Sequence, residues 1–125
     1  MSKKATILVV DDEDSALQLL REALAGDQYE VYAAHDGDEA WKALQQGVVK
    51  DLALLLTDLV MPKMDGMELA RKVTQAYPGA KILFISGYAD EIVYAHQDLA
   101  GVSAFLPKPF DVEILLKRVR ELVGR

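Results

Sequence analysis

Polar side chains that could bind a metal ion or a phosphoryl group follow four separate apolar segments of this chain. Asp11 and Asp12 follow the first segment, Asp58 the third, Ser86 the fourth and Lys108 the last. A single aspartate after an apolar run is weak evidence, because aspartate is also a preferred helix cap. Three carboxylates, a hydroxyl and an ammonium at equivalent points of four segments are much stronger evidence of one site.

The carboxylates favour a divalent cation. Carboxylates held close together repel one another, and their pKa values rise unless a cation compensates. Mg²⁺ prefers oxygen ligands and often takes a few carboxylates while keeping several waters. The sequence therefore predicts a Mg²⁺ site, with Mn²⁺ as an alternative ion.

The same residues could carry phosphoryl chemistry. Lys108 adds a second positive charge, and Ser86 can donate a hydrogen bond to a phosphoryl oxygen. Asp11 and Asp12 are adjacent and suit metal binding, which leaves Asp58 as the nucleophile that would form an acyl phosphate. No Ser/His/Asp or Cys/His arrangement competes, and His35 and His96 lack metal-ligand spacing and are interpreted as surface or helix residues.

Composition limits the class of protein. The 125 residues carry a formal net charge of −6, which argues against nucleic-acid binding by counterion release. No apolar run is long enough for a membrane span or a secretory signal, and cysteine is absent, which suits a reducing compartment such as the cytoplasm. A local basic excess on the last predicted helix is interpreted as a solvated face, with a docking surface as the alternative: Lys117, Arg118, Arg120 and Arg125.

Apolar and amphipathic segments alternate with short connections, which predicts an α/β domain of five βα units, (βα)₅, covering 1–125 with an ordered core of about 5–123. Strands are expected over 6–10, 29–34, 52–57, 81–85 and 104–106, and helices up to Gly26, from Asp36 to Gly47, over 67–77, over 90–99 and after Asp111. Asp36 and Asp111 are expected to cap the helices that follow them. Such units form a parallel sheet with right-handed crossovers and helices on both faces. Ligands bind at the carboxyl ends of its strands, where the polar residues above converge.

The chain resembles the receiver domain of two-component response regulators, the CheY-like superfamily. The resemblance covers essentially the whole chain and depends on four motifs: Val9-Val-Asp-Asp12, Thr57-Asp-Leu-Val-Met-Pro-Lys-Met-Asp-Gly66, Ile85-Ser-Gly87 and Leu106-Pro-Lys-Pro-Phe110. It implies a flavodoxin-like, doubly wound sheet in the order 2-1-3-4-5. It also implies phosphotransfer from a histidine kinase or histidine phosphotransfer protein to an aspartate.

The resemblance also implies roles for individual residues. Asp12 and Asp58 would bind Mg²⁺ directly, Asp11 largely through water, and the Val60 backbone carbonyl would complete the ligands. Lys108 would pair with the phosphoryl oxygens, and Ser86 would move toward them on activation. Phosphorylation would thereby change the face formed by the fourth helix, the fifth strand and the last helix, where a second copy or an output partner could bind.

Further positions of the family pattern concern switching and hydrolysis. Phe105 corresponds to a switch aromatic coupled to Ser86, although a core phenylalanine explains it equally well. The Lys108-Pro109 bond corresponds to a cis peptide, with trans left open. Val60 and Tyr88 flank the phosphoryl group in the family, and an apolar Val60 with a shielding Tyr88 predicts slow autodephosphorylation.

Glycines and a proline near the site have expected structural roles. Gly66 suits a turn or close approach, with Asp65 as a helix cap and Pro62 stiffening the loop. Gly87 would leave room for the phosphate.

Two other functions fit parts of the pattern. A haloacid-dehalogenase-type phosphatase would carry a second aspartate two residues after the nucleophile, and Asp58-Leu-Val60 lacks it. A pseudo-receiver that only binds proteins would have lost an acidic residue or the lysine, and all are present. The expectation is a phosphoacceptor rather than an enzyme, one that assists its own phosphorylation and autodephosphorylation.

Overall fold

The computed structural model describes residues 4–59, 61, 64, 66–87 and 103–124. The strands are β1 (Thr6–Val10), β2 (Glu30–Ala34), β3 (Leu52–Asp58), β4 (Lys81–Ser86) and β5 (Ser103–Pro107), and the helices are α1 (Asp14–Gly26), α2 (Gly37–Gln45), α3 (Gly66–Ala76) and α5 (Val112–Val123). The helix expected over 90–99 lies outside the described residues. No described helix has both the length and the apolar character needed to span a membrane.

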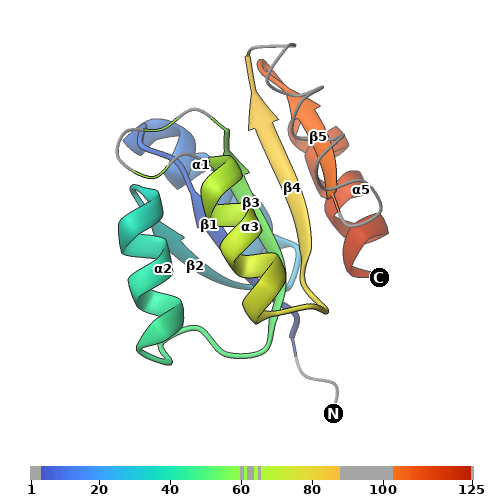
Figure 1. Cartoon of the computed structure of the whole chain (residues 1–125). Helices are drawn as coiled ribbons and strands as arrows, with labels where there is room; N and C mark the ends of the chain where they lie inside the picture. Colours follow the sequence, from blue (N-terminus) through green and yellow to red (C-terminus); the bar gives the residue numbers. More distant parts are fainter. Residues whose placement is uncertain (1–3, 60, 62–63, 65, 88–102, 125) are drawn as a thin grey trace.

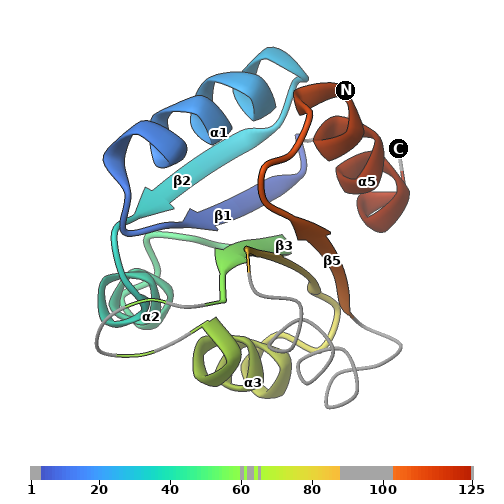
Figure 2. The ribbon, with the colours of Figure 1, turned by 90° about the horizontal axis from the view of Figure 1, so that it is seen from above.

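The strands form one parallel sheet in the order β2-β1-β3-β4-β5, as predicted. Helices α1 and α5 cover one face, and α2 and α3 cover the other, which Figure 2 shows from above. Because both faces are covered, β1 is buried along its whole length, which explains its uninterrupted apolar sequence. This layering directs the carboxyl ends of the strands to one edge of the molecule (Figure 1).

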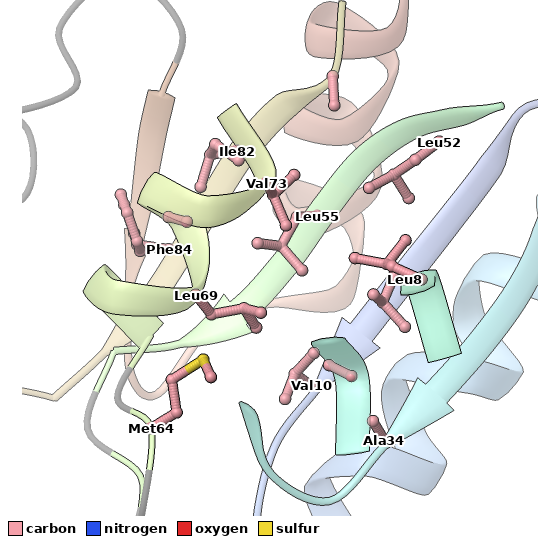
Figure 3. Packing of buried hydrophobic residues seen from close by; sticks show 14 of the residues in the cluster. Leu8, Val10, Ala34, Leu52, Leu55, Met64, Leu69, Val73, Ile82 and Phe84 are labelled. Carbon is pink, nitrogen blue, oxygen red and sulfur yellow. The ribbon is translucent and has the colours of Figure 1, made fainter. Parts of the chain in front are cut away.

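The core lies in two layers, one on each side of the sheet. Leu8, Leu55 and Phe84 pack against α2 and α3, whereas Ile7, Leu54 and other residues of the opposite side pack against α1 and α5. Figure 3 shows the first layer, in which Leu69 and Val73 of α3 contact the strands. Alternate residues of the central strands therefore anchor both layers and hold the strand ends in fixed positions.

Local capping follows the sequence at two helices. The Asp36 carboxylate accepts a hydrogen bond from the Glu39 backbone N–H at 2.8 Å, and Asp111 accepts one from Glu113 at 2.7 Å. Helix α1 ends at Gly26 as predicted, but the left-handed residue beyond it is Gln28, with φ of 74°. The predicted end of this helix at Gly26 is confirmed, and Asp27 follows as the C-cap.

Candidate functional site

Strand register brings the polar residues together at one rim. Val10 of β1 is paired with Thr57 of β3, and Asp58 is paired with Ile85 of β4. Strands β1 and β3 therefore end at about the same level of the sheet. Asp11 then lies beside Asp58, although 47 positions separate them in the sequence. The predicted convergence of strand ends is what the register produces.

Asp11, Asp12 and Asp58 each bring a carboxylate oxygen within 4.8 Å of the others. Asp11 is almost fully buried, at 1% exposed, whereas Asp12 is exposed and the Asp58 side chain is 12% exposed. Hard oxygen donors from three carboxylates match the ligand preference of Mg²⁺. The residues present therefore fit the Mg²⁺ ion that the sequence predicts.

Lys108 forms hydrogen-bonded ion pairs with the two less exposed carboxylates of this cluster. Its Nζ lies 2.8 Å from Oδ2 of Asp58 and 3.4 Å from Oδ2 of Asp11. The side chain is 28% exposed. One ammonium thus bridges a carboxylate that follows β1 and a carboxylate at the end of β3. The predicted pairing of Lys108 with phosphoryl oxygens stays a prediction.

The electrostatics of the site follow from burial and from these pairs. Burial raises the pKa of Asp11, although the Glu13 backbone N–H and the charge of Lys108 oppose the rise, and the charge of Asp58 adds to it. Burial alone would lower the pKa of Lys108, but the hydrogen bond to Asp58 and the charge of Asp11 outweigh burial and raise it. Lys108 is therefore a stable cation beside a cluster of carboxylates.

Ser86 ends β4 at the same rim and is 1% exposed. Its carbonyl accepts a hydrogen bond from the Lys108 backbone N–H at 2.9 Å, which fixes the start of the lysine loop relative to β4. The Lys108–Pro109 peptide bond, for which the sequence left both isomers open, is cis. The structure thus brings Ser86 and Lys108 to the rim beside the carboxylates.

Glycine positions distinguish a structural requirement from an open space. A Cβ on Gly66 would overlap the Asp58 carbonyl oxygen, so the close approach expected there is confirmed. A Cβ on Gly87 would meet no atom of the described residues within 4 Å, so none of their contacts requires that glycine. The expected role of Gly87 in leaving room for a phosphate stays a prediction.

Phe105 lies on β5 with 39% of its surface exposed. The alternative of a core phenylalanine is therefore wrong, and the switch role stays a prediction. Lys117, Arg118 and Arg120 are exposed on α5, as expected for a solvated face, and Arg120 also forms a two-bond ion pair with Asp27 at 2.9 and 3.0 Å. Several predicted residues lie outside the described part of the chain: Val60, Pro62, Asp65, Tyr88, His96 and Arg125.

Sequence reasoning missed the residues that support the loop after Asp58. Met61, Met64 and Met67 are all at least nine-tenths buried, and the Thr57 hydroxyl donates to the Asp58 carbonyl at 2.9 Å. A Cβ on Gly37 would come within 2.6 Å of the Met64 carbonyl, so α2 packs directly against this loop. Three methionines at spacing of three residues were the available signal.

His35 is a surface residue, as interpreted from the sequence. Its side chain is 57% exposed, and its ring nitrogens lie 3.0 Å from an Asp14 oxygen and 3.6 Å from a Glu39 oxygen. These contacts are on opposite sides of the imidazole. His35 is therefore not part of the carboxylate cluster.

A parallel sheet in this order, with three carboxylates and a bonded lysine at its carboxyl edge, defines a CheY-like α/β signalling domain. The family model described as response regulator receiver domain matches residues 7–120, and the chain belongs to that family. It is a receiver domain of two-component signalling.

Individual relatives agree with this assignment. The chain is 35% identical to response regulator receiver protein CpdR of Brucella abortus, covering 94% of this chain and 95% of CpdR. It is 33% identical to sensor kinase CckA of the same organism. That match covers 100% of this chain and 13% of CckA. It is 37% identical to response regulator MprA of Mycobacterium tuberculosis, covering 95% of this chain and 50% of MprA.

Solved structures share the fold. The receiver domain of hybrid histidine kinase CckA has a TM-score of 0.80 and 33% identity, with coverage of 95% of this chain and 99% of that one. Chemotaxis protein CheY4 of Vibrio cholerae has a TM-score of 0.84 and 29% identity, with coverage of 96% and 99%. Relatives therefore include both short single-domain proteins and parts of much longer ones.

Proposed function

We propose that Asp58 accepts a phosphoryl group from a phosphohistidine of a histidine kinase or histidine phosphotransfer protein. The observation that carries the proposal is the ion pair of 2.8 Å between Lys108 and Asp58 within the carboxylate cluster. It joins the candidate nucleophile to the cation that would meet the incoming charge. The reaction then needs alignment and charge neutralisation more than a strong base.

In the proposed step an Oδ oxygen of Asp58 attacks phosphorus, and an acyl phosphate bond forms. The phosphorus–nitrogen bond of the donor breaks, and its electron pair returns to the imidazole nitrogen, which takes up a proton. Lys108 shifts its hydrogen bond from the carboxylate to the phosphoryl oxygens, and the Ser86 hydroxyl donates to another of them. The hydrogen bond between the Lys108 backbone N–H and the Ser86 carbonyl keeps these two donors on the same side of the site.

Asp11, Asp12, Asp58 and the Val60 carbonyl would hold Mg²⁺, with Asp11 acting largely through water. When bound, the ion supplies positive charge next to the phosphoryl oxygens. Burial of Asp11 supports this assignment, because an ionised buried carboxylate is stabilised by a nearby cation. Gly87 would leave space beside the phosphate.

The phosphorylated state would be read through the face that contains β5 and α5. Ser86 would turn toward the phosphate and Phe105 would become buried in response, since its ring is exposed before phosphorylation. A second copy or an output protein would bind the changed face. An apolar Val60 could not position a water molecule for attack on the acyl phosphate, and Tyr88 would shield it. Autodephosphorylation would therefore be slow. The domain would act in the cytoplasm.

The test is incubation with Mg²⁺ and acetyl phosphate, followed by intact mass spectrometry. The expected result is a gain of one phosphoryl group that is absent in Asp58→Asn and absent in EDTA. Asp38→Asn is the control, because Asp38 lies in the first turn of α2. No mass gain in the unaltered chain would favour a pseudo-receiver that only binds proteins.

A further inference from the structure

A groove of about 820 Å³ lies between α1 and β2. Strand β2 is at one edge of the sheet, and β5 is at the other. We name it the β2-edge groove, and Figure 2 shows α1 running alongside β2 there. It is lined by Asp14, Leu17, Gln18, Arg21, Glu22, Ala25, Val31, Ala33 and His35. None of these residues belongs to the carboxylate cluster or to the lysine loop.

One edge of β2 is unpaired within the described part of the chain, where β2 pairs only with β1. Glu30 donates its backbone N–H to Ala5, and the Ala34 carbonyl accepts from Asp11. Backbone groups alternate in direction along a strand, so even-numbered residues of β2 face β1. Val31 and Ala33 therefore direct their N–H and C=O groups outward, and these are the β2 residues that line the groove.

The dimensions suit one extended segment. Val31 and Ala33 lean toward the α1 side, and Leu17 and Ala25 complete an apolar floor. The helix wall from Asp14 to Ala25 is about 16 Å long at 1.5 Å per residue. A strand of about five residues has the same length at 3.3 Å per residue.

The charge of the rim favours a basic occupant. The Asp14 side chain is 87% exposed, and Glu22 lies further along the same helix. The Glu39 side chain is half exposed and lies beside His35. Among the described residues, Arg21 is the one arginine or lysine that lines the groove. A second copy of this chain is disfavoured, because its net charge is also −6 and its rim carries the same carboxylates.

We propose that the β2-edge groove binds an extended segment of a partner protein, which adds a strand to β2. The segment would carry apolar side chains at alternate positions for the floor and a lysine or arginine at an end for the rim carboxylates. Backbone bonds to Val31 and Ala33 would provide affinity, and the alternate side chains would provide selectivity. The inference does not depend on phosphoryl transfer to Asp58.

The experiment titrates the ¹⁵N-labelled chain with the acetylated and amidated peptide Lys-Val-Thr-Val-Thr-Lys and follows amide shifts by NMR. Shifts are expected at Val31, Ala33 and the facing side of α1. Ala33→Pro removes one outward N–H and should weaken binding about tenfold. The double variant Asp14→Asn with Glu22→Gln keeps the backbone intact and should weaken binding about fivefold.

Two controls separate this site from general electrostatic binding. The double variant Glu68→Gln with Glu121→Gln removes the same charge from α3 and α5 and should bind the peptide as the unaltered chain does. Asp58→Asn should also bind equally, so failure of the phosphoacceptor proposal would leave this result unchanged.

Three results would overturn the proposal. Absence of shifts along β2 with the lysine-ended peptide would exclude strand addition. Equal binding of a glutamate-ended peptide of the same core would remove the charge argument. Concentration-dependent broadening of the Val31 and Ala33 amides without peptide would assign the edge to a second copy of this chain instead.

Discussion

The carboxyl ends of the central strands and the outward edge of β2 differ in burial and in what they can bind. At the rim, β1 and β3 are buried on both faces, and their ends fix Asp11 and Asp58 beside Lys108. At the edge, β2 is half exposed, and within the described part of the chain its outward backbone groups face a groove and no paired strand. Rigid burial positions reacting groups, whereas an open edge leaves binding capacity for another chain.

The sharpest test of the rim is a pair of glycine variants. Gly66→Ala should lower the free energy of unfolding by about 3 kcal/mol, because the new Cβ would overlap the Asp58 carbonyl. Gly87→Ala should change it by less than about 1 kcal/mol, because no atom of the described residues lies within 4 Å of the new Cβ. Urea denaturation of both variants measures the difference, and equal stabilities would show that the loop after Asp58 is not tightly packed.

Removing the cation of the rim should slow phosphorylation. Lys108→Ala deletes a charge-assisted hydrogen bond to Asp58, so phosphorylation by acetyl phosphate should be roughly ten- to hundredfold slower. Lys117→Ala on the exposed face of α5 is the matched control and should leave the rate unchanged. A Lys108→Ala rate within twofold of the unaltered rate would remove the lysine from the mechanism.

The charge of Asp11 should oppose folding when no cation is supplied. Burial raises its pKa above the ordinary 3.8, so its favourable contribution exists below that pH and is lost as pH rises through the folded-state pKa. In EDTA at neutral pH, Asp11→Asn should therefore raise the melting temperature. The gain should shrink toward pH 3, where both side chains are neutral.

Asp12→Asn provides the comparison for this prediction, because Asp12 is exposed and its carboxylate stays hydrated. Its effect on the melting temperature in EDTA should be smaller than that of Asp11→Asn. A fall in melting temperature for Asp11→Asn at neutral pH would show that its bond to Lys108 outweighs its burial.

The smallest effect is expected for Ala33→Pro at the edge of β2. Ala33 directs its N–H outward, whereas the adjacent Ala34, which is 1% exposed, directs its N–H toward β1. Ala33→Pro removes an outward N–H and should cost little stability, whereas Ala34→Pro removes an N–H that faces β1 and should cost about 2 kcal/mol more. Thermal unfolding of the two variants measures the difference. Equal losses would mean that the edge is not free in the sense inferred.

Much of this architecture was predictable because local chemistry and fold agree. Apolar runs bounded by polar residues predicted every described strand to within a residue or two, and Asp36 and Asp111 cap the helices that they were expected to cap. The rim was predictable for a similar reason, since parallel strands must end at one edge. Asp11, Asp12, Asp58, Ser86 and Lys108 could therefore be grouped from their positions alone.

Other features depend on distances between segments that sequence order does not specify. The exposure of Phe105, the overlap that forces glycine at position 66 and the packing of Met64 against Gly37 depend on how closely elements approach. The β2-edge groove likewise depends on how α1 lies relative to β2, which the order of the residues does not specify. The order of the residues therefore specifies which groups gather at the strand ends. Tertiary packing sets how deeply each group is buried and leaves one side of β2 unpaired among the described residues, because burial depends on every neighbour at once.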